Sequence, residues 1–210
     1  MGIPVLVLGE SGSGKSTSLR NFEPGEIGIF NVASKPLPFR KKLAKADGAT
    51  YQKIMATMAK PKMKAYAIDD SQYLMAFESF DKVNEIGFQK FTSMALNFYN
   101  LVQFVIRQLP PDVIVYFLQH TEKTDDGRTK AKTLGKMLDN QITLEGLFSI
   151  VLLCKTDGTR HYFETQSDGA TTAKSPMEMF EREIDNDLKA VDTAIREYWE
   201  LSPINTKEDK

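Results

Sequence analysis

The chain has 210 residues, which is enough for one domain with a substantial core and too few for two large domains. Its 27 basic and 28 acidic side chains give a formal net charge of −1, and this balance excludes nucleic-acid binding that relies on overall basicity. The single cysteine, Cys154, excludes an intramolecular disulfide framework and a cysteine-rich zinc site, and we expect it to pack in the core.

Apolar runs are short throughout the sequence. The longest of them, 113–118, is far below the ~20 residues that a membrane-spanning helix needs, and the N-terminus has no pattern typical of an export signal. We therefore expect a soluble, cytoplasmic protein that contacts no membrane.

The first part of the chain alternates short apolar runs with longer segments of helical periodicity. Runs at 3–8, 27–32, 65–68 and 113–118 predict four buried strands. One apolar helix face is predicted by residues that recur at steps of three and four, namely Phe88, Phe91, Ala95, Phe98, Val102, Val105 and Leu109. Strongly apolar strands separated by helices predict an α/β domain with a mostly parallel sheet and helices on both faces.

The pattern changes after the fourth strand. Residues 149–154 and 159–163 flank Asp157-Gly158, and this spacing predicts an antiparallel hairpin with a two-residue turn at one edge of the sheet. An amphipathic C-terminal helix over 184–201 is predicted by its apolar positions, Ile184, Leu188, Val191, Ile195 and Trp199. We expect residues 1–210 to form a single domain.

Charge is unevenly distributed along the chain. The segment 35–64 contains only one acid, Asp47, and is otherwise rich in basic residues, namely Lys35, Arg40, Lys41, Lys42, Lys45, Lys53, Lys60, Lys62 and Lys64. This basic insert is either a solvated surface or a contact for a polyanion, and the sequence leaves both interpretations open.

Residues 9–17 read GESGSGKST and match the phosphate-loop pattern G-x-x-x-x-G-K-[ST] between a predicted strand and a predicted helix. Glycines at three positions permit backbone torsions that turn N–H groups toward phosphate oxygens. Lys15 supplies a positive charge for the β- and γ-phosphates, the Ser16 hydroxyl can bind Mg²⁺, and Thr17 is expected to contact the α-phosphate. The predicted nucleotide-binding residues are Gly9, Glu10, Ser11, Gly12, Ser13, Gly14, Lys15, Ser16 and Thr17.

A magnesium nucleotide site also needs a carboxylate near that hydroxyl, and Asp69 and Asp70 follow the third predicted strand directly. We expect Asp69 to act with Ser16 at the metal and Asp70 to orient or deprotonate the attacking water. A shift of one residue in strand register would exchange these roles. Alternatively, one of the two caps the following helix together with Ser71.

The fourth predicted strand ends at Gln119, whose amide is placed to sense the γ-phosphate, with His120 in a supporting role. We expect 121–136 to be a polar, mobile loop. It carries the candidate DNA-binding residues Lys123, Arg128, Lys130, Lys132 and Lys136. A basic loop next to a γ-phosphate sensor can couple nucleotide state to contact with a phosphate backbone, although a loop that simply covers the nucleotide is the alternative.

Together these features resemble the RecA-type ATPase core of the P-loop class. More narrowly, they resemble the phage-encoded RecA-like ATP-binding proteins of the Sak-four single-strand annealing group. The resemblance spans roughly residues 3–201 and is carried by GESGSGKST, YAIDDSQYLM, VIVYFLQHTEKTDDG, KTLGKMLDN, FETQSDGATTAKSPMEMF and IDNDLKAVDTAIREYW.

The resemblance implies a hydrolase that binds ATP and Mg²⁺, contacts single-stranded DNA and promotes strand annealing or recombination. It also implies a homo-oligomer and an accompanying single-stranded-DNA-binding protein. Carried over by position, Lys15, Ser16 and Asp69 or Asp70 bind the nucleotide and Gln119 senses it. Lys174 resembles the position from which RecA-like subunits reach the γ-phosphate of a neighbour.

The chain departs from the RecA pattern in three ways. Residues 31–35 contain no glutamate after the second strand, so the general base is open and hydrolysis is expected to be slow. We expect no N-terminal element of the kind that links recombinase subunits, and 121–136 holds no pair of aromatics for base stacking. Two alternatives therefore stay open, which are a small-molecule kinase of the P-loop class and a nucleotide-binding regulator with little turnover. The absence of an arginine cluster disfavours the kinase.

Overall fold

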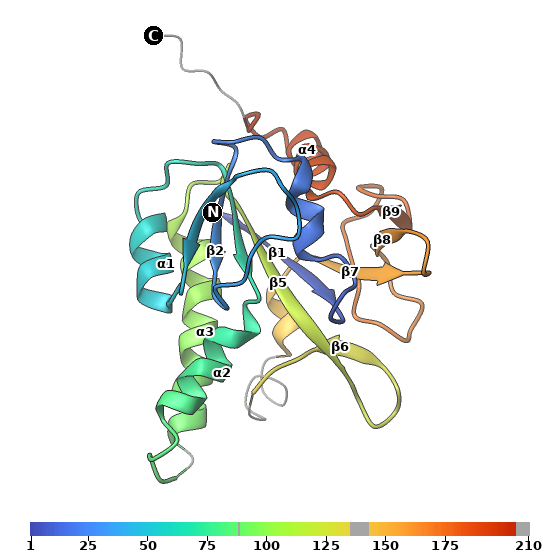
Figure 1. The fold of residues 1–210 in the computed structure, drawn as a ribbon. Coiled ribbons are helices and arrows are strands. Elements are labelled where there is room, and N and C mark those ends of the chain that lie inside the picture. Colours follow the sequence, from blue (N-terminus) through green and yellow to red (C-terminus); the bar gives the residue numbers. More distant parts are fainter. Residues whose placement is uncertain (88, 135–142, 205–210) are drawn as a thin grey trace.

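The computed structural model describes residues 1–87, 89–134 and 143–204, and in them nine strands form one sheet (Figure 1). The strand order is β3-β2-β4-β5-β1-β7-β8-β9, and β6 pairs with β5 alone. In chain order the elements are β1 Ile3–Gly9, η1 Ser16–Asn21, β2 Ile27–Asn31, β3 Ala44–Asp47, α1 Tyr51–Met58, β4 Ala65–Asp69, α2 Gln72–Asp81, α3 Gln89–Gln108, β5 Ile114–Lys123, β6 Thr129–Ala131, η3 Leu144–Leu147, β7 Ile150–Thr156, β8 His161–Glu164, β9 Glu183–Asp185 and α4 Leu188–Tyr198.

The centre of the sheet is parallel, as the apolar runs predict. β1 lies between β5 and β7, and β4 lies between β2 and β5, with all four of these pairings parallel. Side chains of β1 alternate between the two faces, so that Leu6 and Leu8 enter one core cluster while Val5 and Val7 enter the other. Burial on both faces explains why these strands are continuously apolar.

Helices cover both faces of the sheet, which confirms the predicted α/β architecture. The cluster around Leu6 also contains residues of α1, α2 and α3, whereas the cluster around Val5 contains residues of η1 and α4. In Figure 1, α2 and α3 extend beyond the end of the sheet. The predicted apolar face between residues 88 and 109 is confirmed in α3, where Ala95, Phe98, Val102 and Val105 are buried; Phe88 lies outside the described residues.

The antiparallel edge is present, but its details differ from the sequence prediction. β7 and β8 pair from Thr156 and His161 inward, so four residues rather than two connect them. The Asp157 carboxylate stabilises this longer loop by accepting hydrogen bonds from the backbone N–H groups of Thr159 and Arg160. Gly158 still has the positive φ, 91°, for which a glycine is favoured.

The predicted C-terminal helix begins later than expected. Ile184 belongs to β9, which adds a further strand beside β8, and α4 starts at Leu188. The start is fixed by Asp187, whose side chain accepts hydrogen bonds from the N–H groups of Lys189 and Ala190. The apolar positions thus keep a helical spacing from Ile184 onward, although Ile184 itself lies in a strand.

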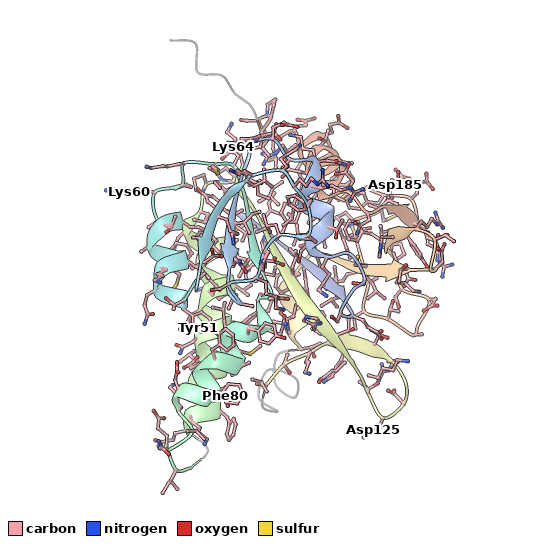
Figure 2. All side chains as sticks on the ribbon, in the orientation of Figure 1. Tyr51, Lys60, Lys64, Phe80, Asp125 and Asp185 are labelled. Atoms are coloured by element: carbon pink, nitrogen blue, oxygen red, sulfur yellow. The ribbon has the colours of Figure 1, made fainter. Side chains whose placement is uncertain are left out.

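Part of the segment 121–136 is strand and not loop within the residues that the structure describes. β5 continues to Lys123, and the chain returns as β6, with Thr121 opposite Ala131 and Lys123 opposite Thr129. This hairpin projects from the body of the sheet, with Asp125 labelled near its tip in Figure 2.

Two further elements differ from the sequence prediction. Edge strand β3 was not predicted, and the helix after the phosphate-loop motif is a short 3-10 helix, η1. In the part of the chain that the structure describes, none of the helices combines the length and the apolar character needed to cross a bilayer.

Candidate functional site

The glycine-rich turn after β1 has the backbone shape that the motif predicts. Gly12 and Gly14 have φ values of 80° and 102°, which glycine adopts without strain. Gly9 does not have a positive φ and is needed for a different reason. A Cβ atom built on Gly9 would lie 2.4 Å from Ser13 Oγ and 2.9 Å from the Cys154 carbonyl oxygen, so only glycine fits there.

Lys15 lies inside this turn rather than in solvent, with 6% of its surface exposed. Its Nζ donates hydrogen bonds to the carbonyl oxygens of Gly9 and Glu10, at 2.8 and 2.9 Å. Burial lowers the pKa of the Lys15 amine, and the charges of Asp69 and Asp70 oppose that shift. The turn therefore holds its cation in place through its own carbonyl groups.

Ser16 and Asp69, which are 53 residues apart in the chain, meet at the carboxyl edge of the sheet. Ser16 Oγ donates a 2.8 Å hydrogen bond to Asp69 Oδ1. Burial raises the pKa of Asp69, and the hydrogen bond from Ser16 acts in the opposite direction. The sequence left open which of the two adjacent aspartates would lie beside the Ser16 hydroxyl, and in the structure it is Asp69.

Asp70 is turned away from Ser16 and lies between two cationic or polar groups. Lys35 Nζ is 2.7 Å from its Oδ2, and His120 Nε2 is 3.4 Å from its Oδ1. Burial alone would raise the pKa of Asp70, but hydrogen bonds from His120 and Lys35 outweigh it and hold the pKa at about 2. Such a carboxylate can orient water but is a weak proton acceptor.

Lys35 is a site residue that the sequence did not single out, since it appeared only as the first base of the segment 35–64. Besides pairing with Asp70, its Nζ lies 5.1 Å from the ring centroid of Tyr73 in a cation–π contact. The only signal in the sequence is its position four residues after the last residue of β2, at the same edge of the sheet as Asp69.

Gln119 is fully buried on β5, between the phosphate-loop strand and the carboxylate strand. Its Oε1 accepts a hydrogen bond from Ser71 Oγ at 3.2 Å, and its Nε2 donates to the carbonyl oxygen of Lys132 at 2.7 Å. The side chain therefore connects the turn after Asp70 with the returning arm of the β5–β6 hairpin.

Two residues of the antiparallel edge hold the phosphate loop from outside. His161 Nδ1 lies 2.7 Å from the Ser13 carbonyl oxygen, and the Cys154 thiol donates to the same oxygen at 3.0 Å. Cys154 is buried, as expected, and burial raises the pKa of its thiol to about 11. No spacing in the sequence indicates the contact of His161.

The candidate DNA-binding residues are spread over the hairpin. Lys123, Arg128 and Lys132 are exposed, but Arg128 pairs with Asp126 at 2.7 Å. Lys130 is half-buried and pairs with Glu122 at 3.1 Å. Lys136 lies outside the described residues.

Lys174 lies on the side of β7 that faces away from β1. It is half-buried, and its backbone forms an antiparallel bridge with Val151. The β7 residue opposite Gly9 is Cys154, and it lies three residues after Val151. Among the remaining predicted residues, Glu10 and Ser11 are exposed on the phosphate loop and Thr17 is half-buried in η1.

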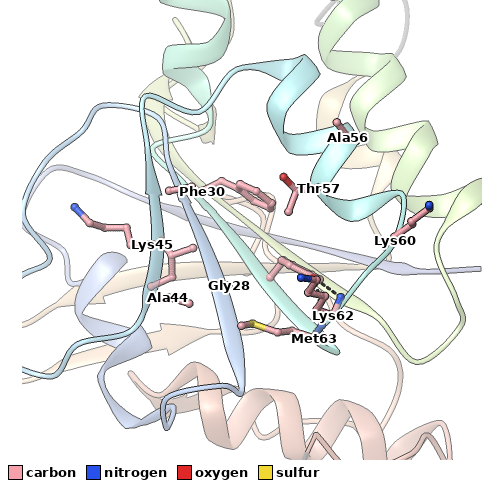
Figure 3. Close-up of a pocket in the computed structure, with 12 residues that line it drawn as sticks. Gly28, Phe30, Ala44, Lys45, Ala56, Thr57, Lys60, Lys62 and Met63 are labelled. Atoms are coloured by element: carbon pink, nitrogen blue, oxygen red, sulfur yellow. Dashed lines mark hydrogen bonds between the residues drawn. The ribbon is translucent and has the colours of Figure 1, made fainter.

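A cavity of about 470 Å³ lies away from the phosphate loop, between α1 and the outer strands β2 and β3 (Figure 3). Its floor includes Gly28, Phe30 and Met63, and Lys60 and Lys62 stand at its margin. Gly28 is the second residue of β2 and Met63 precedes β4, so this cavity is at the amino ends of the strands.

No protein-family model matches the chain, and a search of curated proteins found no match. The function therefore has to be inferred from the side chains described above.

Proposed function

We propose that the protein is a Mg²⁺-dependent ATPase with a RecA-type core that binds single-stranded DNA and promotes strand annealing or recombination, as in the phage proteins that the sequence resembles. The observation that carries the nucleotide part of this proposal is the hydrogen bond between Ser16 and Asp69 beside the glycine-rich turn. A phosphate-loop hydroxyl beside a strand-end carboxylate is the pair that holds Mg²⁺ in P-loop nucleotide sites.

The residues of the turn fit the triphosphate of a nucleotide. Ser13 Oγ is buried and has no hydrogen-bond partner, so a polar group is available that a phosphate oxygen would satisfy. Lys15 already points its amine into the turn, and the positive φ of Gly12 and Gly14 is typical of backbone that surrounds an anion.

The donor set also fits Mg²⁺ held together with the nucleotide. The described residues contain no group of three or more histidine, cysteine or acidic side chains that would hold a metal by themselves. Mg²⁺ in phosphate sites uses few protein ligands and retains water and phosphate oxygens. Ser16 would bind the ion directly and Asp69 would hold its water ligands, and the ion would neutralise charge on the phosphates.

The residues available for hydrolysis are Asp70 and Gln119. Asp70 stands next to Asp69 and can orient a water molecule, while Gln119 links that turn to the hairpin. The low pKa of Asp70, about 2, favours slow turnover, because the carboxylate accepts a proton poorly. The same observation favours the second candidate, a nucleotide-binding regulator with little turnover.

The contact with DNA, the homo-oligomer and the accompanying single-stranded-DNA-binding protein come from the resemblance alone. In a RecA-like assembly, Lys174 would act at the γ-phosphate of a neighbouring subunit. Mixing a Lys174→Ala subunit with a Lys15→Ala subunit should then restore some of the activity that each lacks alone. If no mixing ratio restores ATPase activity, this result counts against action of Lys174 between subunits.

The deciding experiment is a titration of the ATPase rate against single-stranded DNA, double-stranded DNA and no DNA, with Mg²⁺ present. We expect hydrolysis that single-stranded DNA accelerates, and a Lys15→Ala variant that neither binds nor hydrolyses Mg·ATP by calorimetry and phosphate release. Lys90→Ala, a half-buried lysine of α3 outside both the loop and the basic insert, is the matched control and should behave as wild type.

Three results would contradict parts of the proposal. Binding of Mg·ATP without turnover would favour the regulator. Rapid phosphate transfer to a nucleoside or sugar, indifferent to DNA, would favour the kinase. No heat on addition of Mg·ATP would refute the nucleotide site itself.

A further inference from the structure

A pocket of about 360 Å³ lies beside the candidate nucleotide site, between α2 and the β5–β6 hairpin. One wall is formed by α2 and includes Tyr73 and Phe80; the other is formed by β5 and the returning chain and includes His120 and Lys132. Figure 2 labels Phe80 on α2 and Asp125 near the tip of the hairpin. The volume is in the range of small-ligand sites, about 300–1,000 Å³.

The α2 wall presents a row of aromatic rings. Tyr73, Phe77 and Phe80 recur at steps of four and three residues and so share one helix face. Tyr73 and Phe77 are stacked, with ring centroids 5.4 Å apart, while Phe77 is 43% and Phe80 73% exposed. Of these three, Tyr73 and Phe80 line the pocket, and an exposed aromatic ring that lines a pocket is typical of a binding surface.

The facing wall has the opposite chemistry. Lys132 is exposed there and, within the described residues, has no ion pair, while Thr121 and Thr133 add polar groups. A partner protein or a second copy that covered the aromatic rings with apolar surface would also remove water from this polar wall. One aromatic wall opposite one cationic wall fits a nucleotide unit, whose base has an apolar face and whose phosphate is negative.

We infer that this pocket binds a nucleotide of single-stranded DNA, with its base against the rings of Phe80 and Tyr73 and its phosphate at Lys132. The inference rests on the proposed function and adds to it the place of contact. It also supplies the aromatics that 121–136 lacks, because they lie across the pocket on α2 and not on the hairpin.

The pocket is connected to the candidate nucleotide site through Tyr73. The ring of Tyr73 packs edge-on against His120, with centroids 6.2 Å apart, and Lys35 lies over its face. Both His120 and Lys35 contact Asp70. A base that displaces Tyr73 would therefore move the groups that hold Asp70, which gives DNA a physical route to the hydrolysis rate.

The test measures the binding of a fluorescent oligothymidylate to the full chain by fluorescence anisotropy at several salt concentrations. We expect Phe80→Ala to weaken binding at least about fivefold, the low end for loss of one stacked base, with an unchanged salt slope. Phe80→Trp should retain affinity and show quenched tryptophan fluorescence on binding. Lys132→Ala should reduce the salt slope by about 0.7. Ile86→Ala, an exposed apolar residue of the same region outside the pocket, is the control.

Calorimetry with Mg·ATP on the same samples separates this inference from the proposed function. If wild type binds the oligonucleotide and Tyr73→Ala and Phe80→Ala bind it equally well, the pocket is not the contact while the proposed function stands. If these variants change the sedimentation coefficient instead of DNA affinity, the aromatic row is an interface between copies and the inference is wrong. If wild type binds Mg·ATP but no oligonucleotide, both the DNA part of the proposed function and the inference fail.

Discussion

At the scale of single residues, the pKa values of the two neighbouring aspartates are shifted in opposite directions. Asp69 is buried beside a neutral hydroxyl, and burial raises its pKa; Asp70 is held by Lys35 and His120, and its pKa is about 2. Adjacent carboxylates with such different environments are typical of sites where each has its own role. Each aspartate can be tested separately.

Lys35→Ala should raise the pKa of Asp70 from about 2 toward the ordinary value of 3.8. A depressed pKa stabilises the folded protein above pH ~4, and the effect disappears as pH falls toward 2. The variant should therefore lose stability at pH 7, by at most about 1 kcal/mol because Lys35 is largely exposed, and lose none at the acid end. Carboxyl NMR titration measures the midpoint. The control is Lys45→Ala, whose lysine pairs with Asp47, and it should leave the pKa of Asp70 unchanged. A pKa of Asp70 that stays near 2 in Lys35→Ala would show that Lys35 does not lower it.

Asp69→Asn should stabilise the empty protein and weaken its binding of Mg·ATP. Because the pKa of Asp69 is raised in the folded state, its ionised form costs stability, and the cost grows as pH rises above about 3.8. Recovery of ~1 kcal/mol would raise Tm at pH 7 by about 2–4 °C. The further rise in Tm on addition of Mg·ATP should be lost. Asp125→Asn, on the exposed hairpin tip, should change neither value. A less stable variant that binds Mg·ATP normally would contradict this assignment.

The residues of the motif could be predicted from sequence because one short segment carries their chemistry. Asp69 and Gln119 could be predicted because polar residues that end parallel strands meet at one edge. Lys35 and His161 could not be predicted, since their contacts depend on side-chain paths across the sheet and not on spacing.

At the scale of elements, β5 and its hairpin connect the candidate nucleotide site with the pocket that we propose for DNA. Gln119→Ala removes the donor to the Lys132 carbonyl and one partner of Ser71. Leaving a buried group without its partner costs about 1–3 kcal/mol, so the hairpin should open more readily. Hydrogen exchange of the Lys132 N–H, which is bonded to the His120 carbonyl, should become about tenfold faster. Gln52→Ala on α1 is the control, and equal exchange rates in both variants would rule out this link.

Elements with continuous apolar runs could be predicted, and those defined by pairing alone could not. β3 consists of exposed residues at the sheet edge, so no hydrophobic periodicity marks it. β6 and β9 have three residues each and exist because a neighbouring strand is present to bond them. Helix α4 was placed too early because Ile184 continues its apolar spacing.

At the scale of the whole molecule, α4 closes one face of the sheet through a buried cation. Arg196 is 4% exposed and donates hydrogen bonds to Asp192 and to the carbonyl oxygens of Asp112, Lys64 and Ser202. Tyr116 also donates to Asp192, at 3.0 Å. One side chain thus joins segments from three distant parts of the chain.

Arg196→Ala should destabilise the protein by about 3–5 kcal/mol, because it leaves the Asp192 charge buried without its partner. Urea unfolding at pH 7 measures the loss. Asp192→Asn added to this variant should recover part of it, since the uncompensated charge is then removed. Arg107→Ala, an exposed arginine in the last turn of α3, should change stability by no more than about 0.5 kcal/mol. A loss of similar size in both single variants would refute the role of the buried pair.

The carbonyl of Ser13 is held by Cys154 and His161, which follow it by 141 and 148 residues. A fragment that stopped before β7 would still contain every letter of the glycine-rich signature, yet the Ser13 carbonyl would lose both side chains that bond to it. The glycine-rich signature and the bonds that hold its backbone are thus separate properties of this chain, because the second depends on residues that lie 141 and 148 positions later in the sequence.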